Sequence, residues 1–186
     1  MAKIGFLCGS LREGSINQKL QGALMHRYAQ AGFDVDAVDL GEYPLPIYHG
    51  DAGSPEALQP LIDRLNTFDG VVVVTPEYNG GLPALLKNSI DWITTVSTEP
   101  FKGAVWGVAA CTPGPLSGVV CMRELALLLM RIGGQTCPTF IGVGNAGAAF
   151  DADGLLHEGI GADLANRQVE EMGRAIDARG AARQAA

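Results

Sequence analysis

The chain has 186 residues, a length that suits one folded domain with a buried core. Apolar residues make up 47% of the sequence and charged residues 18%, which excludes an intrinsically disordered chain. The formal net charge of −7 argues against broad binding to nucleic acids or anionic membranes, since both need a basic surface.

The sequence indicates a cytoplasmic protein. No apolar run approaches the roughly 20 residues of a membrane-spanning helix, and the segment Met1–Leu7 is too short for a secretory signal. The three histidines are scattered and do not indicate a metal site. No two cysteines have CxxC spacing, so we interpret all four as buried, reduced thiols: Cys8, Cys111, Cys121 and Cys137.

Strand and helix patterns alternate through the first half of the chain. Lys3–Gly9 is a short apolar run closed by glycine, which predicts a buried strand, and Ser15–Ala31 carries apolar residues at helical spacing. Residues 33–37 alternate between apolar and acidic side chains, which predicts a strand with one wetter side. A loop rich in Gly and Pro over residues 41–55 precedes a helical pattern over residues 58–65.

The alternation continues through the second half. Gly70–Thr75 contains four consecutive valines, which predicts a strand buried on both faces of a parallel sheet. We then expect a helix opened by Pro83, a strand over Ala104–Ala110, and a helix over Met122–Met130 stopped by Gly133-Gly134. A last strand over Gln135–Val143 should have Pro138 near an edge or bend. A terminal helix over Ile160–Arg179 should precede a frayed end at Gly180–Ala186.

Five strand signals alternating with five helix signals predict an α/β doubly wound domain with helices on both faces of a parallel sheet. Ligands of such sheets bind beyond the carboxyl ends of the strands. The loops of interest are therefore Gly9–Ser15, Thr75–Leu82 and Cys111–Gly118.

The first of these loops has the features of a phosphate site. It leads into a helix whose first N–H groups are unpaired and carry partial positive charge, which favours an anion. Hydroxyl and amide side chains could add donors, and Arg12 could grip two phosphate oxygens. The loop is neither GxGxxG nor GxxxxGK[ST], so it does not indicate a common dinucleotide or Walker site. Taken alone, Ser15 could equally be a helix cap and Arg12 a surface charge.

The second loop has the features of a site for a flat ring. Two glycines leave room near the backbone, Tyr78 offers an aromatic surface, and Asn79 offers a donor and an acceptor. An ordinary turn before a helix is the alternative. We argue against Glu77 as a general base, because a loop that positions a flat ring needs orientation more than a protein base. For Lys87, Asn88 and Asp91 we expect loop support, with a solvated helix face as the alternative, and for Trp92 we expect a core position.

Together the loops resemble the NAD(P)H-dependent FMN reductase family of the flavodoxin-like superfamily. Residues 9–17 match the family pattern GSxRxxSxN, residues 76–92 match its pattern PEYNxxxPxxLKNxIDW throughout, and residues 150–154 are similar to its FDxxG segment. The resemblance implies a flavodoxin-like, five-stranded parallel sheet in the order 2-1-3-4-5, and one domain over residues 1–186.

The resemblance also implies the activity: electrons pass from NADPH or NADH through FMN to small acceptors such as quinones, free flavin, azo dyes or chromate. FMN carries the chemistry, so no protein side chain is expected to be catalytic. The residues that the resemblance assigns to FMN are Ser10, Arg12, Ser15, Ile16 and Asn17 around the phosphate, Pro76, Glu77, Tyr78, Asn79 and Gly80 along the ring, and Thr112 and Gly114 on its other side.

The third loop departs from the family pattern. Relatives often have Gly-Gly-x-Arg where this chain has Ser117-Gly118-Val119-Val120, and Arg123 lies one helical turn later. In relatives, the arginine of the Gly-Gly-x-Arg pattern tends to lie near subunit contacts. Because this chain lacks it, the sequence leaves both a homodimer and a homotetramer open. A flavodoxin-type electron carrier, which does not oxidise NAD(P)H, is the alternative function; its phosphate loop is usually rich in Thr and lacks arginine. A receiver or interaction domain is a third class, but it would need an Asp where the third strand ends in Thr75-Pro76.

Overall fold

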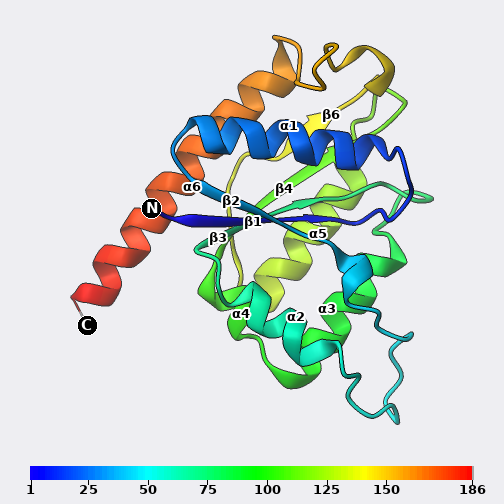
Figure 1. Cartoon of the computed structure of the whole chain (residues 1–186), viewed down its shortest axis with the longest axis vertical. Helices are drawn as coiled ribbons and strands as arrows, with labels where there is room; N and C mark the ends of the chain where they lie inside the picture. The colour runs from blue at the N-terminus through cyan, green and yellow to red at the C-terminus, as the bar shows by residue number, and fades with distance from the viewer. Residues whose placement is uncertain (186) are drawn as a thin grey trace.

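The computed structural model describes residues 1–185, which form a twisted parallel sheet between two layers of helices (Figure 1). The strand order is β2-β1-β3-β4-β5, with β6 also paired to β4, and every pairing is parallel. The predicted order 2-1-3-4-5 is confirmed. The strands are β1 (Lys3–Cys8), β2 (Asp34–Val38), β3 (Gly70–Val74), β4 (Val105–Cys111), β5 (Gln135–Thr136) and β6 (Ile141–Val143).

Helices cover both faces of the sheet, as predicted. One layer is α1 (Ile16–Gln30) with α6 (Ile160–Gln184), and the other is α2 (Leu58–Leu65), α3 (Ala84–Val96), the short α4 (Glu99–Gly103) and α5 (Val119–Arg131). Two 3₁₀ turns, η1 (Leu40–Glu42) and η2 (Ala146–Ala148), lie in the loops after β2 and β6. Among residues 1–185, none of the helices combines the length and apolar character needed to cross a bilayer.

The valine strand β3 shows how the sheet joins the two layers. Val71 and Val73 pack with the layer of α2, α3 and α5, whereas Val72 and Val74 pack with α1 and α6. Successive side chains of a strand point to opposite faces, so a strand covered on both faces must be apolar at every position. All five residues of β3 are buried, which confirms the interpretation of the valine run.

The last strand differs from the prediction because it is broken. The expected continuous strand over Gln135–Val143 is two short strands, β5 and β6, and Pro138 lies in the break. Cys137 still donates its N–H to Trp106 O at 2.7 Å, but proline has no N–H and Thr139 N–H turns to the Glu171 carboxylate at 2.9 Å.

A buried glutamine occupies this break. The Gln168 side chain, from α6, donates to Val108 O at 3.1 Å and to Thr139 O at 2.7 Å, and it accepts from Tyr28 Oη–H at 3.1 Å. Gly107 makes room for it, because a Cβ at that position would lie 2.6 Å from Gln168 Oε1. The amide of Gln168 therefore supplies to β4 the donor that a continuous neighbouring strand would have given.

One further expectation was wrong, and one helix was missed. The expected frayed end at Gly180–Ala186 is helical as far as Gln184, while residue 186 lies outside the described part of the chain. Arg179 donates to Lys102 O, and Arg183 donates to Gly103 O, so the end of α6 is tied to α4. Helix α4 itself, only five residues long, was not predicted.

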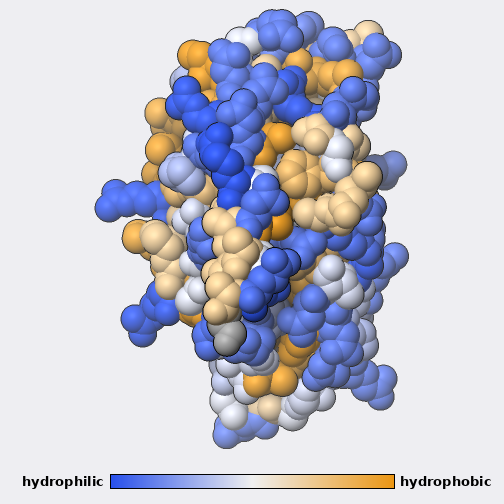
Figure 2. All heavy atoms as spheres, turned by 90° about the vertical axis from the view of Figure 1, so that its left-hand side faces the viewer, coloured by the Kyte–Doolittle hydropathy of each residue, from blue (hydrophilic) through white to orange (hydrophobic). Residues whose placement is uncertain are grey.

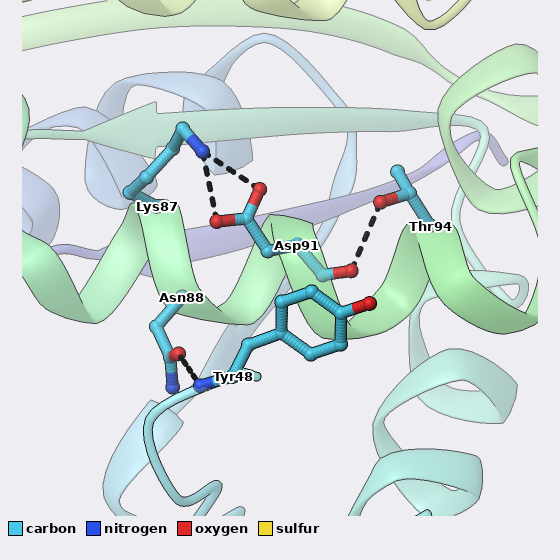
Figure 3. Close-up of polar contacts among 5 residues, drawn as sticks. All are labelled: Tyr48, Lys87, Asn88, Asp91 and Thr94. Atoms are coloured by element: carbon cyan, nitrogen blue, oxygen red, sulfur yellow. Dashed lines mark hydrogen bonds and ion pairs between the residues drawn. The ribbon is translucent and has the colours of Figure 1, made fainter. Parts of the chain in front are cut away.

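The long loop between β2 and α2 is fastened to α3, as expected from the polar side of that helix (Figure 3). Asn88 accepts from Tyr48 N–H at 2.8 Å and donates to Pro46 O at 2.9 Å. Trp92, which is buried as predicted, donates to the same carbonyl at 2.6 Å, and its ring meets that of Tyr48 edge-on. Loop support is therefore confirmed for Asn88 and wrong for Lys87 and Asp91, which pair with each other on the solvated face of the helix.

The two ends of the sheet differ in character. The strands start at the side where both termini lie, on the left of Figure 1, and their carboxyl ends and connecting loops lie opposite. Figure 2 faces the first side, which is largely hydrophilic with hydrophobic atoms in separate small patches. The carboxyl ends are the side at which this class of sheet binds ligands.

Candidate functional site

The three loops after β1, β3 and β4 meet around one pocket of about 240 Å³. Nine of the predicted residues line it: Ser10, Arg12, Ser15, Ile16, Asn17, Pro76, Glu77, Tyr78 and Thr112. Two more, Cys111 and Pro113, also line it and were not singled out from the sequence, although they flank Thr112. The other three predicted residues, Asn79, Gly80 and Gly114, belong to the same loops but do not line the pocket. The structure therefore brings most of the predicted set together.

The first loop places hydroxyls and amides around the start of α1. Ser15 caps the helix by accepting from Asn17 N–H at 3.3 Å, as the alternative interpretation proposed, and Ser10 accepts from Arg12 N–H at 3.4 Å. Gly14 has a φ of +67°, the left-handed conformation that lets the chain turn into the helix. Within residues 1–185 the Arg12 side chain is exposed and makes no ion pair.

The second loop is a tight turn whose tip is Asn79-Gly80. Tyr78 and Gly81 exchange backbone hydrogen bonds of 3.2 and 3.1 Å, and Asn79 and Gly80 both have positive φ, +53° and +75°. Asn-Gly is the pair that most readily adopts two successive left-handed residues. The turn leaves Tyr78 52% exposed, and its side chain lines the pocket.

Two carboxylates lock this turn to α5. Glu77 Oε2 accepts from Val120 N–H at 3.1 Å and from Cys121 N–H at 3.0 Å, so its charge lies at the start of that helix. In return, Glu124 Oε2 accepts from Leu82 N–H at 2.9 Å. The Glu77 carboxylate therefore has a structural role, which is to hold the turn against α5, and this role does not involve proton transfer.

The third loop leaves β4 beside α1 and enters α5 through two left-handed residues. Asn17 bonds to both backbone groups of Cys111, accepting from its N–H at 2.9 Å and donating to its carbonyl at 3.0 Å. Ser117 and Gly118 have φ of +57° and +72°, and a Cβ on Gly118 would lie 2.5 Å from Ala110 Cβ. Glycine is therefore required where the loop crosses the end of β4.

All four cysteines are buried and free, as predicted. Burial raises the pKa of the Cys8 and Cys111 thiols to about 11 and that of the Cys121 and Cys137 thiols to about 12. The thiolate is the reactive form of cysteine, so these side chains are inert at neutral pH even where Cys111 lines the pocket.

Comparison with known proteins assigns the chain to a family. The sequence model of the family described as NADPH-dependent FMN reductase matches residues 2–148. The chain belongs to this family. The matched residues contain all three loops of the pocket, and the resemblance found in the sequence is confirmed.

Individual relatives of this FMN reductase agree with the assignment. A quinone reductase of Escherichia coli (strain K12) is 32% identical over 142 residues, which cover 73% of the chain and 74% of the relative. A 2-hydroxy-1,4-benzoquinone reductase of a Burkholderia species is 38% identical over 105 residues, 56% of the chain and 55% of the relative. The solved structure of FerB, a flavoenzyme NAD(P)H:(acceptor) oxidoreductase from Paracoccus denitrificans, superposes with a TM-score of 0.81 at 28% identity, covering 95% and 98% of the two chains.

The family decides between the functions that the sequence left open. The chain is an FMN-dependent oxidoreductase with a reduced nicotinamide nucleotide as reductant, and the flavodoxin-type carrier is not supported.

Proposed function

We propose that the protein uses the pocket between the three loops to hold FMN and reduces quinone-type acceptors with NAD(P)H. The observation that carries this proposal is the pocket itself, because unpaired donors of the first loop and the aromatic surface of the second loop line the same cavity. The names of two relatives, a quinone reductase and a 2-hydroxy-1,4-benzoquinone reductase, support a quinone as the acceptor.

The donors of the first loop fit a phosphate. The Ser10 and Ser15 hydroxyls each accept a backbone N–H and, within the described chain, donate to no other group, so both protons are available. The Ile16 N–H, in the first turn of α1, likewise has no acceptor among residues 1–185. Together with the unpaired Arg12 guanidinium, these groups form a site suited to an anion: it has neutral donors, a helix N-terminus and one positive charge.

The surface that the second and third loops give to the pocket fits a flat aromatic ring. Pro76, Tyr78 and Pro113 line it with apolar surface, and Thr112 adds a hydroxyl that donates to Gly114 O at 2.9 Å. Bound FMN would supply the redox chemistry, accepting a hydride from the nicotinamide and passing electrons to the acceptor. The chain's own residues hold the cofactor, fix its orientation and leave one side open to substrates, and Glu77 serves this role by fastening the turn to α5.

The proposal is tested by titrating the flavin-free protein with FMN. Arg12→Ala should weaken FMN binding by roughly 1.5–3 kcal/mol, the range for a hydrogen bond to a charged group, and leave the folded state unchanged because Arg12 is exposed. Glu13→Ala is the matched control, since Glu13 is exposed on the same loop but does not line the pocket. A wild-type protein that binds no FMN would refute the proposed function; unchanged affinity in Arg12→Ala would remove only Arg12 from the site.

We also propose that the protein is a cytoplasmic homodimer or homotetramer whose subunits pair through α5. Within this helix, exposed apolar residues lie on either side of Arg123 at spacings of three and four, in a stripe of Val120, Leu127 and Met130. Such spacing favours side-by-side packing of two helices, and a two-fold axis would bring the stripe against its own copy. Four reduced thiols agree with a reducing compartment.

Sedimentation velocity tests the oligomer. Leu127→Glu, in the middle of the stripe, should shift the protein toward monomer, whereas Ile160→Glu, at an exposed apolar position on α6, should not. A wild-type protein that sediments only as monomer would contradict the oligomer.

A further inference from the structure

Asn17 lies in the first turn of α1 and is only 3% exposed, and its carboxamide faces the end of β4. Its Oδ1 accepts from Cys111 N–H at 2.9 Å and its Nδ2 donates to Cys111 O at 3.0 Å. A single side chain thus pairs with both backbone groups of a residue 94 positions away.

These two backbone groups would otherwise lose their partner where β3 ends. Alternate residues of β4 bond to β3, and Ala109 O still accepts from Thr75 N–H at 2.8 Å. Cys111 is the next residue on that side, but after Thr75 the chain turns away through Pro76 into the second loop. Asn17 therefore stands in for the missing continuation of β3, and it decides where the third loop leaves the sheet.

Three other backbone hydrogen bonds join the third loop to the end of β6 and the segment after it. Thr112 N–H donates to Val143 O at 2.9 Å, Thr112 O accepts from Ala146 N–H at 3.1 Å, and Gly114 O accepts from Asn145 N–H at 3.0 Å. These contacts tie the loop to the segment after β6. The two bonds of Asn17 instead connect the third loop to α1, and hence to the phosphate end of the pocket.

We propose that Asn17 is a positioning residue that holds Thr112 and Pro113 against the ring end of the pocket, and that it contributes to flavin affinity through this loop and not through the phosphate. The resemblance to the family placed Asn17 among the phosphate contacts. In the structure both of its polar atoms are already engaged by Cys111, whereas the serine hydroxyls and Arg12 beside it are free to donate. The ring-binding part of this inference rests on the proposed function.

Comparing FMN with riboflavin, which lacks the phosphate, separates the two roles. Each full-length variant is titrated with both flavins, and quenching of flavin fluorescence reports binding. Arg12→Ala should weaken FMN alone, whereas Asn17→Ala should weaken both flavins by the same factor, roughly ten-fold. The visible absorption bands of the bound flavin, which respond to the groups beside the ring, should shift in Asn17→Ala and not in Arg12→Ala. A loss confined to FMN would overturn the proposal.

Hydrogen exchange in the flavin-free chain tests the positioning without any ligand. Asn17→Ala should raise exchange over residues 111–114 and leave residues 10–15 unchanged. Gln18→Ala is the matched control, because Gln18 Nε2 donates to Ser10 O at 3.2 Å and its loss should affect the first loop instead. If Asn17→Ala does not fold, Asn17→Ser, which keeps a donor and an acceptor on a shorter side chain, gives the same comparison. Unchanged exchange over residues 111–114 would overturn the inference, whereas a wild-type protein that binds no flavin would refute only the proposed function.

Discussion

Gln168 offers a direct test of how the broken side of the sheet is held together. In Gln168→Met the side chain keeps its length and apolar stem but loses the amide. Val108 O and Thr139 O would then lack the donor that they share, and Tyr28 Oη–H would lack its acceptor. These groups are buried, so water cannot replace the lost partner without opening the core.

The expected cost follows from these contacts. A buried polar group left without a partner costs about 1–3 kcal/mol, so two carbonyls and a hydroxyl together should cost about 3–9 kcal/mol. For a chain of this size each kcal/mol lowers Tm by about 2–4 °C, which predicts a fall of roughly 6 °C at the least. Tyr28→Phe removes one hydrogen bond and should cost about 1 kcal/mol.

Unfolding in guanidinium, followed by the fluorescence of the buried Trp92 and Trp106, measures both variants. The double variant is the decisive control. Once Gln168 is methionine, the Tyr28 hydroxyl has no acceptor, so adding Tyr28→Phe should cost nothing further or restore some stability. A loss below about 1 kcal/mol in Gln168→Met, or simple additivity in the double variant, would refute the reasoning.

Two further predictions concern the third loop and the thiols. Gly118→Ala should destabilise the protein by about 2–4 kcal/mol, because the new Cβ meets Ala110 at a left-handed φ; thermal unfolding measures this, and a Tm within 2 °C of wild type would contradict it. Burial raises the pKa of all four thiols, to about 11 for Cys8 and Cys111 and about 12 for Cys121 and Cys137. The native protein should therefore react with iodoacetamide at pH 8 far more slowly than a free thiol does, and the reaction should become faster as the pH rises. Mass spectrometry should find four labels only after unfolding, and rapid labelling of the native chain would show that the thiols are accessible.

The sequence predicted those features that depend on local patterns. The alternation of strand and helix signals indicated the layers and the loops, and the valine run identified the strand that is buried on both faces. Two loop motifs then located most of the pocket, because loops at the carboxyl ends of neighbouring parallel strands meet in space.

The features that sequence patterns missed depend on contacts between distant residues. Pro138 indicated an edge or bend, but nothing near it shows that Gln168, 30 positions later, completes the hydrogen bonds of β4. The five residues of α4 are too few for a periodic signal, and the end of α6 is ordered by arginines that reach the carbonyls of α4. Asn17 matched a phosphate motif, and only the fold reveals its bonds to Cys111.

The interruption at Pro138 also affects whether copies of this protein can pair through the edges of their sheets. A long, straight strand on the rim of a sheet is a template on which a second molecule can add its own strand, the first step toward aggregation. Here one rim is divided into pieces of two and three residues, and the other, β2, carries Asp34 and Asp36. Neither rim therefore offers a long, uncharged ladder on which the strand of a neighbouring molecule could pair.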